Sequence, residues 1–168
     1  MFLISAATLL LIIAFCAVYF SSLNHQAIQV TVPGYFYDSS NDNMAEQCSV
    51  FIDGRYDSSF FHEGSFIGNI SIVSDSIEIS EKYIEFCFEN SVAIPKTEDE
   101  WGHQYTSRIH SIIQNEKASA LVIVLYNKYD IKDDSVTGSF DKSLPIFICV
   151  GDISKAEAQN LICSHYGK

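Results

Sequence analysis

The sequence predicts a mainly β protein of the α+β type: an antiparallel sheet or a two-sheet sandwich with one C-terminal helix, preceded by a single N-terminal transmembrane helix. Three observations predict it. Residues 1–20 are apolar except for Ser5 and Thr8. From residue 28, short alternating runs rich in Val, Ile, Phe and Tyr are separated by Gly, Asp, Asn and Ser, which is typical of strands and turns. Residues 154–157 then form a helix capping box.

The apolar start predicts a membrane anchor. A helix over residues 1–20 spans about 30 Å, the thickness of the hydrocarbon core of a bilayer. A cleaved signal peptide is the alternative, but the segment has no basic start and no small residues before a cleavage point. A lipidation box is also poor, because the bulky Phe15 precedes Cys16. We therefore expect an anchor over 1–20, a polar linker over 21–27 and a globular domain over 28–168.

The side of the membrane follows from weaker signals. No Lys or Arg precedes Arg55, so the positive-inside rule gives no orientation. Only an amino group precedes the anchor, which favours an exported, extracytoplasmic domain, with a cytoplasmic-facing domain as the alternative. The formal net charge of −11 in 168 residues disfavours nucleic acid and anionic lipid headgroups as ligands.

The globular domain contains a series of candidate strands and turns. Asp53-Gly54 predicts a two-residue hairpin turn, and residues 115–117 predict a second turn. In the run 66–73, Phe66, Ile70 and Ile72 share one face, and Gly68 leaves room for another backbone or ring. The expected strands are 28–32, 47–52, 56–61, 66–73, 76–79, 83–88, 105–114, 119–126 and 144–150.

The chain ends with a predicted helix over residues 155–166. Ser154 and Glu157 form the capping box, and Ala158, Leu161 and Ile162 recur at helical spacing. We expect this helix to cover one side of the sheet.

Several of these features together resemble a group of small, uncharacterised membrane-anchored or lipoprotein-like extracytoplasmic proteins of Firmicutes-type Gram-positive bacteria. They are VTVPGY at residues 30–35, IDGRY at 52–56, F-x-G-x-I-x-I at 66–72 and SKAEA at 154–158. The resemblance implies an extracytoplasmic β domain and assigns no catalytic residue. The chain departs from the group in lacking a sound lipidation box, and the segment around Trp101 has no counterpart.

The cysteines allow two interpretations. Cys48, Cys87, Cys149 and Cys163 are either free, mostly buried thiols or partners in disulfides, for which Cys149 with Cys163 is a plausible pair between a strand and the helix packed on it. Cys87 shares a strand face with two glutamates, which disfavours burial there. The sequence has no closely spaced Cys/His pair, so it does not predict a structural zinc site.

Catalytic signals are few. His62 and Glu63 form the most compact polar group, but the second metal-binding His of H-E-x-x-H is missing, and a solvated loop is the simpler interpretation. His103 follows Trp101 and an acidic run, which is typical of an exposed loop. We assign no metal and no cofactor. A Ser/His/acid site assembled in space stays open as an alternative.

These observations favour a membrane-tethered, extracytoplasmic β domain with a binding, adaptor or structural role towards an envelope protein or surface ligand. The absence of a catalytic motif favours a non-enzymatic role. A cell-surface hydrolase and a cytoplasmic-facing domain are the alternatives.

Overall fold

The computed structural model describes residues 24–41, 45–59, 62–89, 91–96, 107–115, 119–132 and 135–167. The predicted anchor over 1–20 lies outside these residues. Among the residues described, no helix has the length and apolar character needed to cross a membrane. The first strand begins at Asn24, within the range 21–27 that the sequence predicts as a linker.

Eight of the strands form one closed antiparallel barrel. The order around it is β1, β10, β7, β6, β5, β4, β3, β2. The barrel strands are β1 (Asn24–Asp38), β2 (Ala45–Ser59), β3 (His62–Val73), β4 (Glu78–Glu89), β5 (Val92–Pro95), β6 (Ile109–Gln114), β7 (Ala120–Leu125) and β10 (Ile146–Gly151). The remaining strands, β8 (Lys128–Lys132) and β9 (Ser135–Ser139), form a separate hairpin, and the helix is α2 (Lys155–Tyr166).

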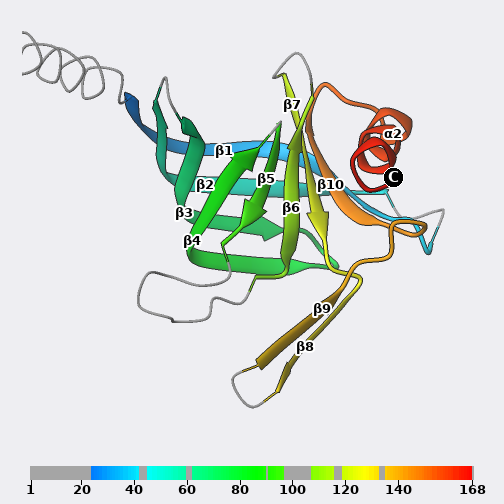
Figure 1. The fold of residues 1–168 in the computed structure, drawn as a ribbon. Helices are drawn as coiled ribbons and strands as arrows, with labels where there is room; N and C mark the ends of the chain where they lie inside the picture. The colour runs from blue at the N-terminus through cyan, green and yellow to red at the C-terminus, as the bar shows by residue number, and fades with distance from the viewer. Residues whose placement is uncertain are drawn as a thin grey trace, which may run out of the picture.

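Figure 1 shows β1, β2 and β3 running behind β5, β6, β7 and β10, which cross them steeply, while α2 lies outside the barrel beside β10. The mainly β class, the antiparallel pairing and the single C-terminal helix are confirmed. Of the two predicted arrangements, an antiparallel sheet or a two-sheet sandwich, the structure has the antiparallel sheet, closed into a barrel. The sheet closes because residues 34–38 of β1 pair with residues 146–150 of β10.

The barrel interior is filled by apolar side chains, as expected for eight strands. Phe86 and Ile72 are fully buried there, and Phe36 is 5% exposed. A second apolar layer lies between the barrel wall and α2, where Ala158 and Ile162 pack with Phe147. Strands β7 and β10 are apolar on both faces because one face meets the interior and the other meets the flank that the helix covers.

The predicted turn at Asp53-Gly54 is wrong. Strand β2 continues through both residues, and Gly54 lies opposite Gly68 of β3. A Cβ at Gly54 would lie 2.7 Å from Cζ of Phe66 and 2.4 Å from the carbonyl oxygen of Ile67. Gly54 therefore provides room for a ring and a close backbone rather than a turn.

Several local predictions are confirmed. Phe66, Ile70 and Ile72 are all buried in the interior, and the Phe66 ring occupies the space that Gly68 leaves. Strands β6 and β7 pair antiparallel on either side of the second predicted turn, whose residues 116 and 117 lie outside the described part. Helix α2 has the predicted bounds, and both hydrogen bonds of its capping box are formed.

Candidate functional site

Strand β1 is paired along both edges only in its second half. Residues 34–38 pair with β10, whereas residues 24–37 pair with β2. Within the described ranges, residues 24–33 have no strand on the β10 side (Figure 1). Pro33, which has no N–H, stands where the pairing with β10 ends. We call residues 24–33 the open edge.

The open edge turns unpaired backbone groups outward. The backbone N–H of Ser39 donates to the carbonyl of Pro145 at 3.2 Å, on the side of β10. Successive residues of an antiparallel strand direct these groups to alternate sides, so the odd-numbered residues of β1 face that side. The N–H and C=O groups of Ala27, Gln29 and Thr31 therefore point away from β2.

Natural sheet edges are protected by charged residues, proline or bulges. Residues 21–37 contain no Asp, Glu, Lys or Arg, and the pairing of β1 with β2 shows no register shift. The single proline lies at the far end of the open edge. The open edge can therefore accept the backbone of another extended segment.

An apolar cleft of about 380 Å³ lies at the end of the open edge. Val32, Leu121 and Val150 line it together with Pro33 and Gly151. The first three of these side chains also pack on the barrel core. Val30, two residues before Val32 on the same face, is 37% exposed. The inner apolar surface of the barrel thus reaches solvent beside the open edge.

A polar groove of about 550 Å³ adjoins the cleft at Ser119, which lines both. Asp152 and Glu157 give it a negative character. The Glu157 carboxylate accepts hydrogen bonds from the N–H of Ser154 at 3.0 Å and its hydroxyl at 2.6 Å, so it is held by the helix cap. On the opposite wall, Oδ1 of Asn115 accepts from the N–H of Ser119 at 2.9 Å. Both walls of the groove are therefore fixed by hydrogen bonds.

The structure does not describe the side chains of the three polar site candidates from the sequence, His62, Glu63 and His103. The backbone of His62 starts β3 opposite Ser59, while the side chains of His62 and Glu63 fall outside the described part. His103 also falls outside it. A role for these three side chains stays a prediction.

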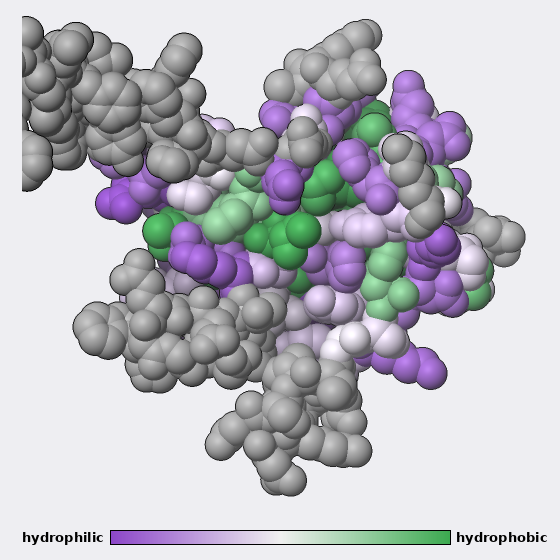
Figure 2. Space-filling view, in the orientation of Figure 1, coloured by the Kyte–Doolittle hydropathy of each residue, from purple (hydrophilic) through white to green (hydrophobic). Residues whose placement is uncertain are grey.

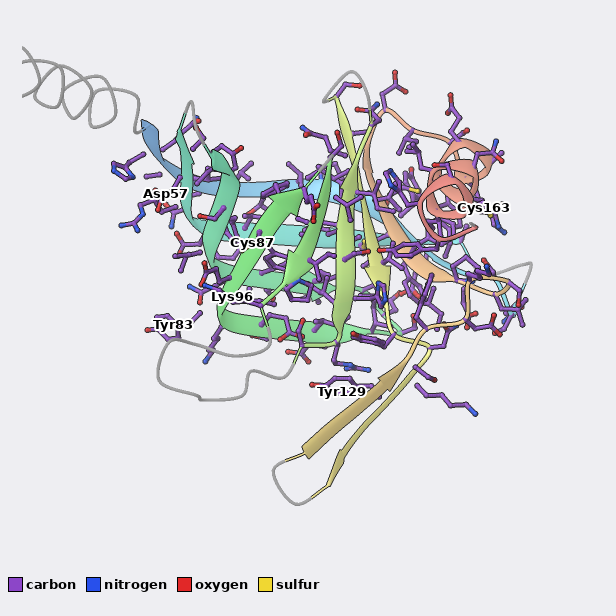
Figure 3. The ribbon with its side chains drawn as sticks, viewed as in Figure 1. Asp57, Tyr83, Cys87, Lys96, Tyr129 and Cys163 are labelled. Carbon is purple, nitrogen blue, oxygen red and sulfur yellow. The ribbon has the colours of Figure 1, made fainter. Side chains whose placement is uncertain are left out.

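Cys149 and Cys163 do not form a disulfide; both are free thiols, as are Cys48 and Cys87. Ile162 of α2 faces the barrel, and the next position, Cys163, lies about 100° further round the helix. Cys163 is exposed (Figure 3). Burial raises the pKa of the Cys149 thiol to about 12, which makes it a poor nucleophile.

One histidine binds a carboxylate on the outer surface. Nδ1 of His25 lies 2.7 Å from Oδ1 of Asp57, and Nε of Arg55 donates to Oδ2 of Asp57 at 2.8 Å. Hydrogen bonds from His25 and Arg55 hold the pKa of Asp57 below its usual range. Ser65 lies opposite Asp57 on β3, so the carboxylate stands between histidine and serine. A catalytic triad needs the histidine in the middle.

His110 lies near a serine, and among the described residues no acidic side chain is bonded to its ring. Its Nδ1 is 3.4 Å from Oγ of Ser111, and its ring packs against Tyr126, Phe140 and Tyr166. The Ser111 hydroxyl instead receives the hydroxyl hydrogen bond of Tyr166 at 2.6 Å. Burial alone lowers the pKa of His110, so no carboxylate contributes there. The cluster packs α2 onto the barrel.

No metal-binding group was found where the structure is described: no three His, Cys, Asp or Glu side chains lie together there. The Asp38 carboxylate accepts from the N–H of Ser40 at 2.9 Å, and that of Glu46 accepts from the N–H of Ser76 at 2.9 Å. These acidic residues thus stabilise turns.

A second apolar surface lies on the outer face of β3, β4 and β5. Ile94 is 54% exposed and lies opposite Cys87, while Ile67 is 37% exposed. The residue opposite Ile67 is Glu85, whose carboxylate binds Lys96 at 3.0 Å. Figure 2 shows hydrophilic residues interrupting the hydrophobic ones on this face. The surface is less continuous than the cleft.

No family model, no curated protein and no solved structure matches the chain. The resemblance to Firmicutes-type envelope proteins therefore stays a prediction. The fold and site define a class instead: an eight-stranded antiparallel barrel with a helix on one flank, in which residues 24–33 of β1 have no strand on the β10 side within the described ranges. Sequence reasoning missed this edge, although its signal was present in the uncharged run of residues 21–37.

Proposed function

We propose that the protein is a membrane-tethered, extracytoplasmic binding module that recruits an extended polypeptide segment along the open edge of β1. The unpaired backbone of this edge is the observation that carries the proposal. Strand addition to a sheet edge is a recurring mode of peptide recognition, in which backbone hydrogen bonds supply affinity and alternate side chains supply specificity.

The apolar cleft supplies the specificity element. A strand added beside β1 alternates its side chains between the outer and inner faces of the barrel wall. The inward ones meet the half-exposed Val30 and the cleft formed by Val32, Leu121 and Val150. We therefore expect a segment with Val, Ile or Leu among its inward positions.

The proposed anchor brings this edge close to the bilayer. The anchor ends at residue 20, and β1 begins at Asn24, so the connection spans at most about 14 Å. A recruited segment would then belong to a protein in or near the same membrane.

Peptide selection tests the binding function directly. A display library of extended peptides is selected against the full-length chain in detergent, and the affinity of one selected peptide is measured by fluorescence anisotropy. Gln29→Pro removes an outward N–H and should weaken binding at least about tenfold, since several backbone bonds depend on the alignment at this point. Gln29→Ala keeps the N–H and should stay within about twofold. Equal binding by both variants contradicts the proposal.

Membrane topology is tested separately. Cells carrying a C-terminal epitope tag are treated with an impermeant protease while a cytoplasmic marker is followed. Loss of the tag with the marker intact supports an extracytoplasmic domain. Protection until lysis supports the alternative, a cytoplasmic-facing domain, and contradicts this part of the proposal.

A further inference from the structure

We propose that the segment recruited by the open edge is β1 of a second copy of this chain, paired antiparallel about Ile28. This inference rests on the proposed function, because it names the occupant of the same edge. It follows from the backbone pattern, the charges and the apolar surface of residues 24–33.

The backbone pattern of the edge is complementary to itself. Pairing centred on Ile28 places Ala27 opposite Gln29 and His25 opposite Thr31 of the second copy. These residues are all odd-numbered, so the outward N–H and C=O groups of each copy meet those of the other. The inner faces then place Ile28 against Ile28, and Gln26 against Val30.

The charge distribution permits two copies to meet here. Each chain carries a formal charge of −11, and like charges directly opposite each other destabilise a strand pair. Residues 21–37 are free of Asp, Glu, Lys and Arg, and the pairing about Ile28 sets no two charged side chains opposite each other. The edge therefore joins two strongly acidic molecules at an uncharged stretch.

The same pairing also buries apolar side chains of the open edge. Val30 is 37% exposed and Ile28 is half-buried in a single copy. A second β1 covers Ile28 with its own Ile28, while Val30 lies opposite Gln26 and diagonal to Ile28 of the second copy. The shared ladder alone is smaller than a standard interface of about 1,600 Å², so we expect weak association in solution. Two copies anchored in one bilayer associate more strongly because confinement raises their effective concentration.

Cysteine cross-linking tests this pairing. Ile28→Cys is introduced into the full-length chain after Cys16, Cys87 and Cys163 are changed to Ser, which leaves the buried Cys48 and Cys149. Residue 28 faces itself at a non-hydrogen-bonded position, where Cα atoms are about 4.5 Å apart and a disulfide fits. Under mild oxidation in vesicles, Ile28→Cys should form dimers at least about tenfold faster than Ile94→Cys on β5.

Adding Gln29→Pro to Ile28→Cys should return the cross-linking rate to that of the Ile94→Cys control, whereas adding Gln29→Ala should not. Equal rates for Ile28→Cys and Ile94→Cys, or cross-linking that survives Gln29→Pro, would overturn the pairing. Failure of cross-linking while a selected peptide still binds removes only the second copy as occupant. Failure of both removes strand recruitment itself.

Discussion

The two halves of β1 share one strand and one neighbour, β2, yet have different surroundings. Residues 34–37 pair with both β2 and β10, and Phe36 among them is buried. Residues 24–33 have β2 alone in the described structure, and Val30 among them is partly exposed. The difference arises because β10 ends at Gly151, whose φ of +87° turns the chain towards α2. A barrel can thus close and still leave part of one strand with a neighbour on one side only.

The largest expected contrast is in packing. Phe36→Ala removes a ring that is 5% exposed in the barrel core and should lower the free energy of unfolding by about 3–5 kcal/mol. Val30→Ala, on the same face but in the open half, should cost about 1 kcal/mol or less because much of the side chain already meets solvent. Urea unfolding of the full-length variants measures both. Similar losses would show that the two halves are equally enclosed.

Proline substitution sharpens the comparison at the backbone. Val30→Pro removes an N–H that faces β2 and should cost about 3 kcal/mol or more, whereas Gln29→Pro removes one that faces solvent and should cost less than about 1 kcal/mol. Thermal unfolding measures the stability lost in Val30→Pro and in Gln29→Pro, with Gln29→Ala as the matched control. A large loss for Gln29→Pro would mean that the outward N–H is already bonded.

The stability of the flank under α2, which lies beside the closed half of β1, should depend on pH through His110. Burial places the folded pKa of His110 below its ordinary value of 6.5. At pH values between the pKa of His110 in the folded protein and 6.5, the unfolded chain binds a proton that the native state does not. The free energy of unfolding therefore falls as the pH falls through this range. Tyr126, Phe140, Tyr166 and Ser111 face the ring, and none carries charge in this range.

Urea unfolding between about pH 5 and 8 measures this dependence, with His110→Phe as the comparison. Glu81 acts in the opposite sense: burial raises the pKa of its carboxyl, so its contribution to stability falls as pH rises. The difference between parent and variant isolates His110. An unchanged pH profile in His110→Phe would contradict the assignment.

The smallest effect is expected at the ion cluster of the open half. Asp57 accepts from His25 and Arg55, whose side chains are 56% and 58% exposed. Asp57→Asn should cost less than about 1 kcal/mol, because exposed ion pairs are screened by water and salt. Chemical denaturation in low and high salt checks this. A larger loss would indicate that the cluster holds the β1 and β2 ends together.

The elements predictable from the sequence are those with local causes. The capping box of Ser154 and Glu157 sets the start of α2, and alternation in residues 66–73 sets the face of β3. The turn predicted at Asp53-Gly54 failed because Gly54 serves a long-range need, space for the Phe66 ring, which a turn signal does not distinguish. Strands β5, β8 and β9 are short and were not predicted.

Closure and the site depend on pairings distant in sequence. The barrel closes when Gly34 meets Val150, a pairing that no local pattern encodes. The open edge begins where the pairing of β1 with β10 stops, at Gly34. The uncharged composition of residues 21–37 signals an edge that is not protected, but only the structure shows that its neighbour is missing.

Amide hydrogen exchange along β1 tests the central claim most directly. The full-length chain is measured with one copy per detergent micelle, so that no second copy covers the edge. We predict an alternating pattern, in which the N–H groups of Ala27, Gln29 and Thr31 exchange rapidly while those of Ile28, Val30 and Val32 are protected by β2. Uniform protection across these six amides would show that the edge is already paired and would contradict the account.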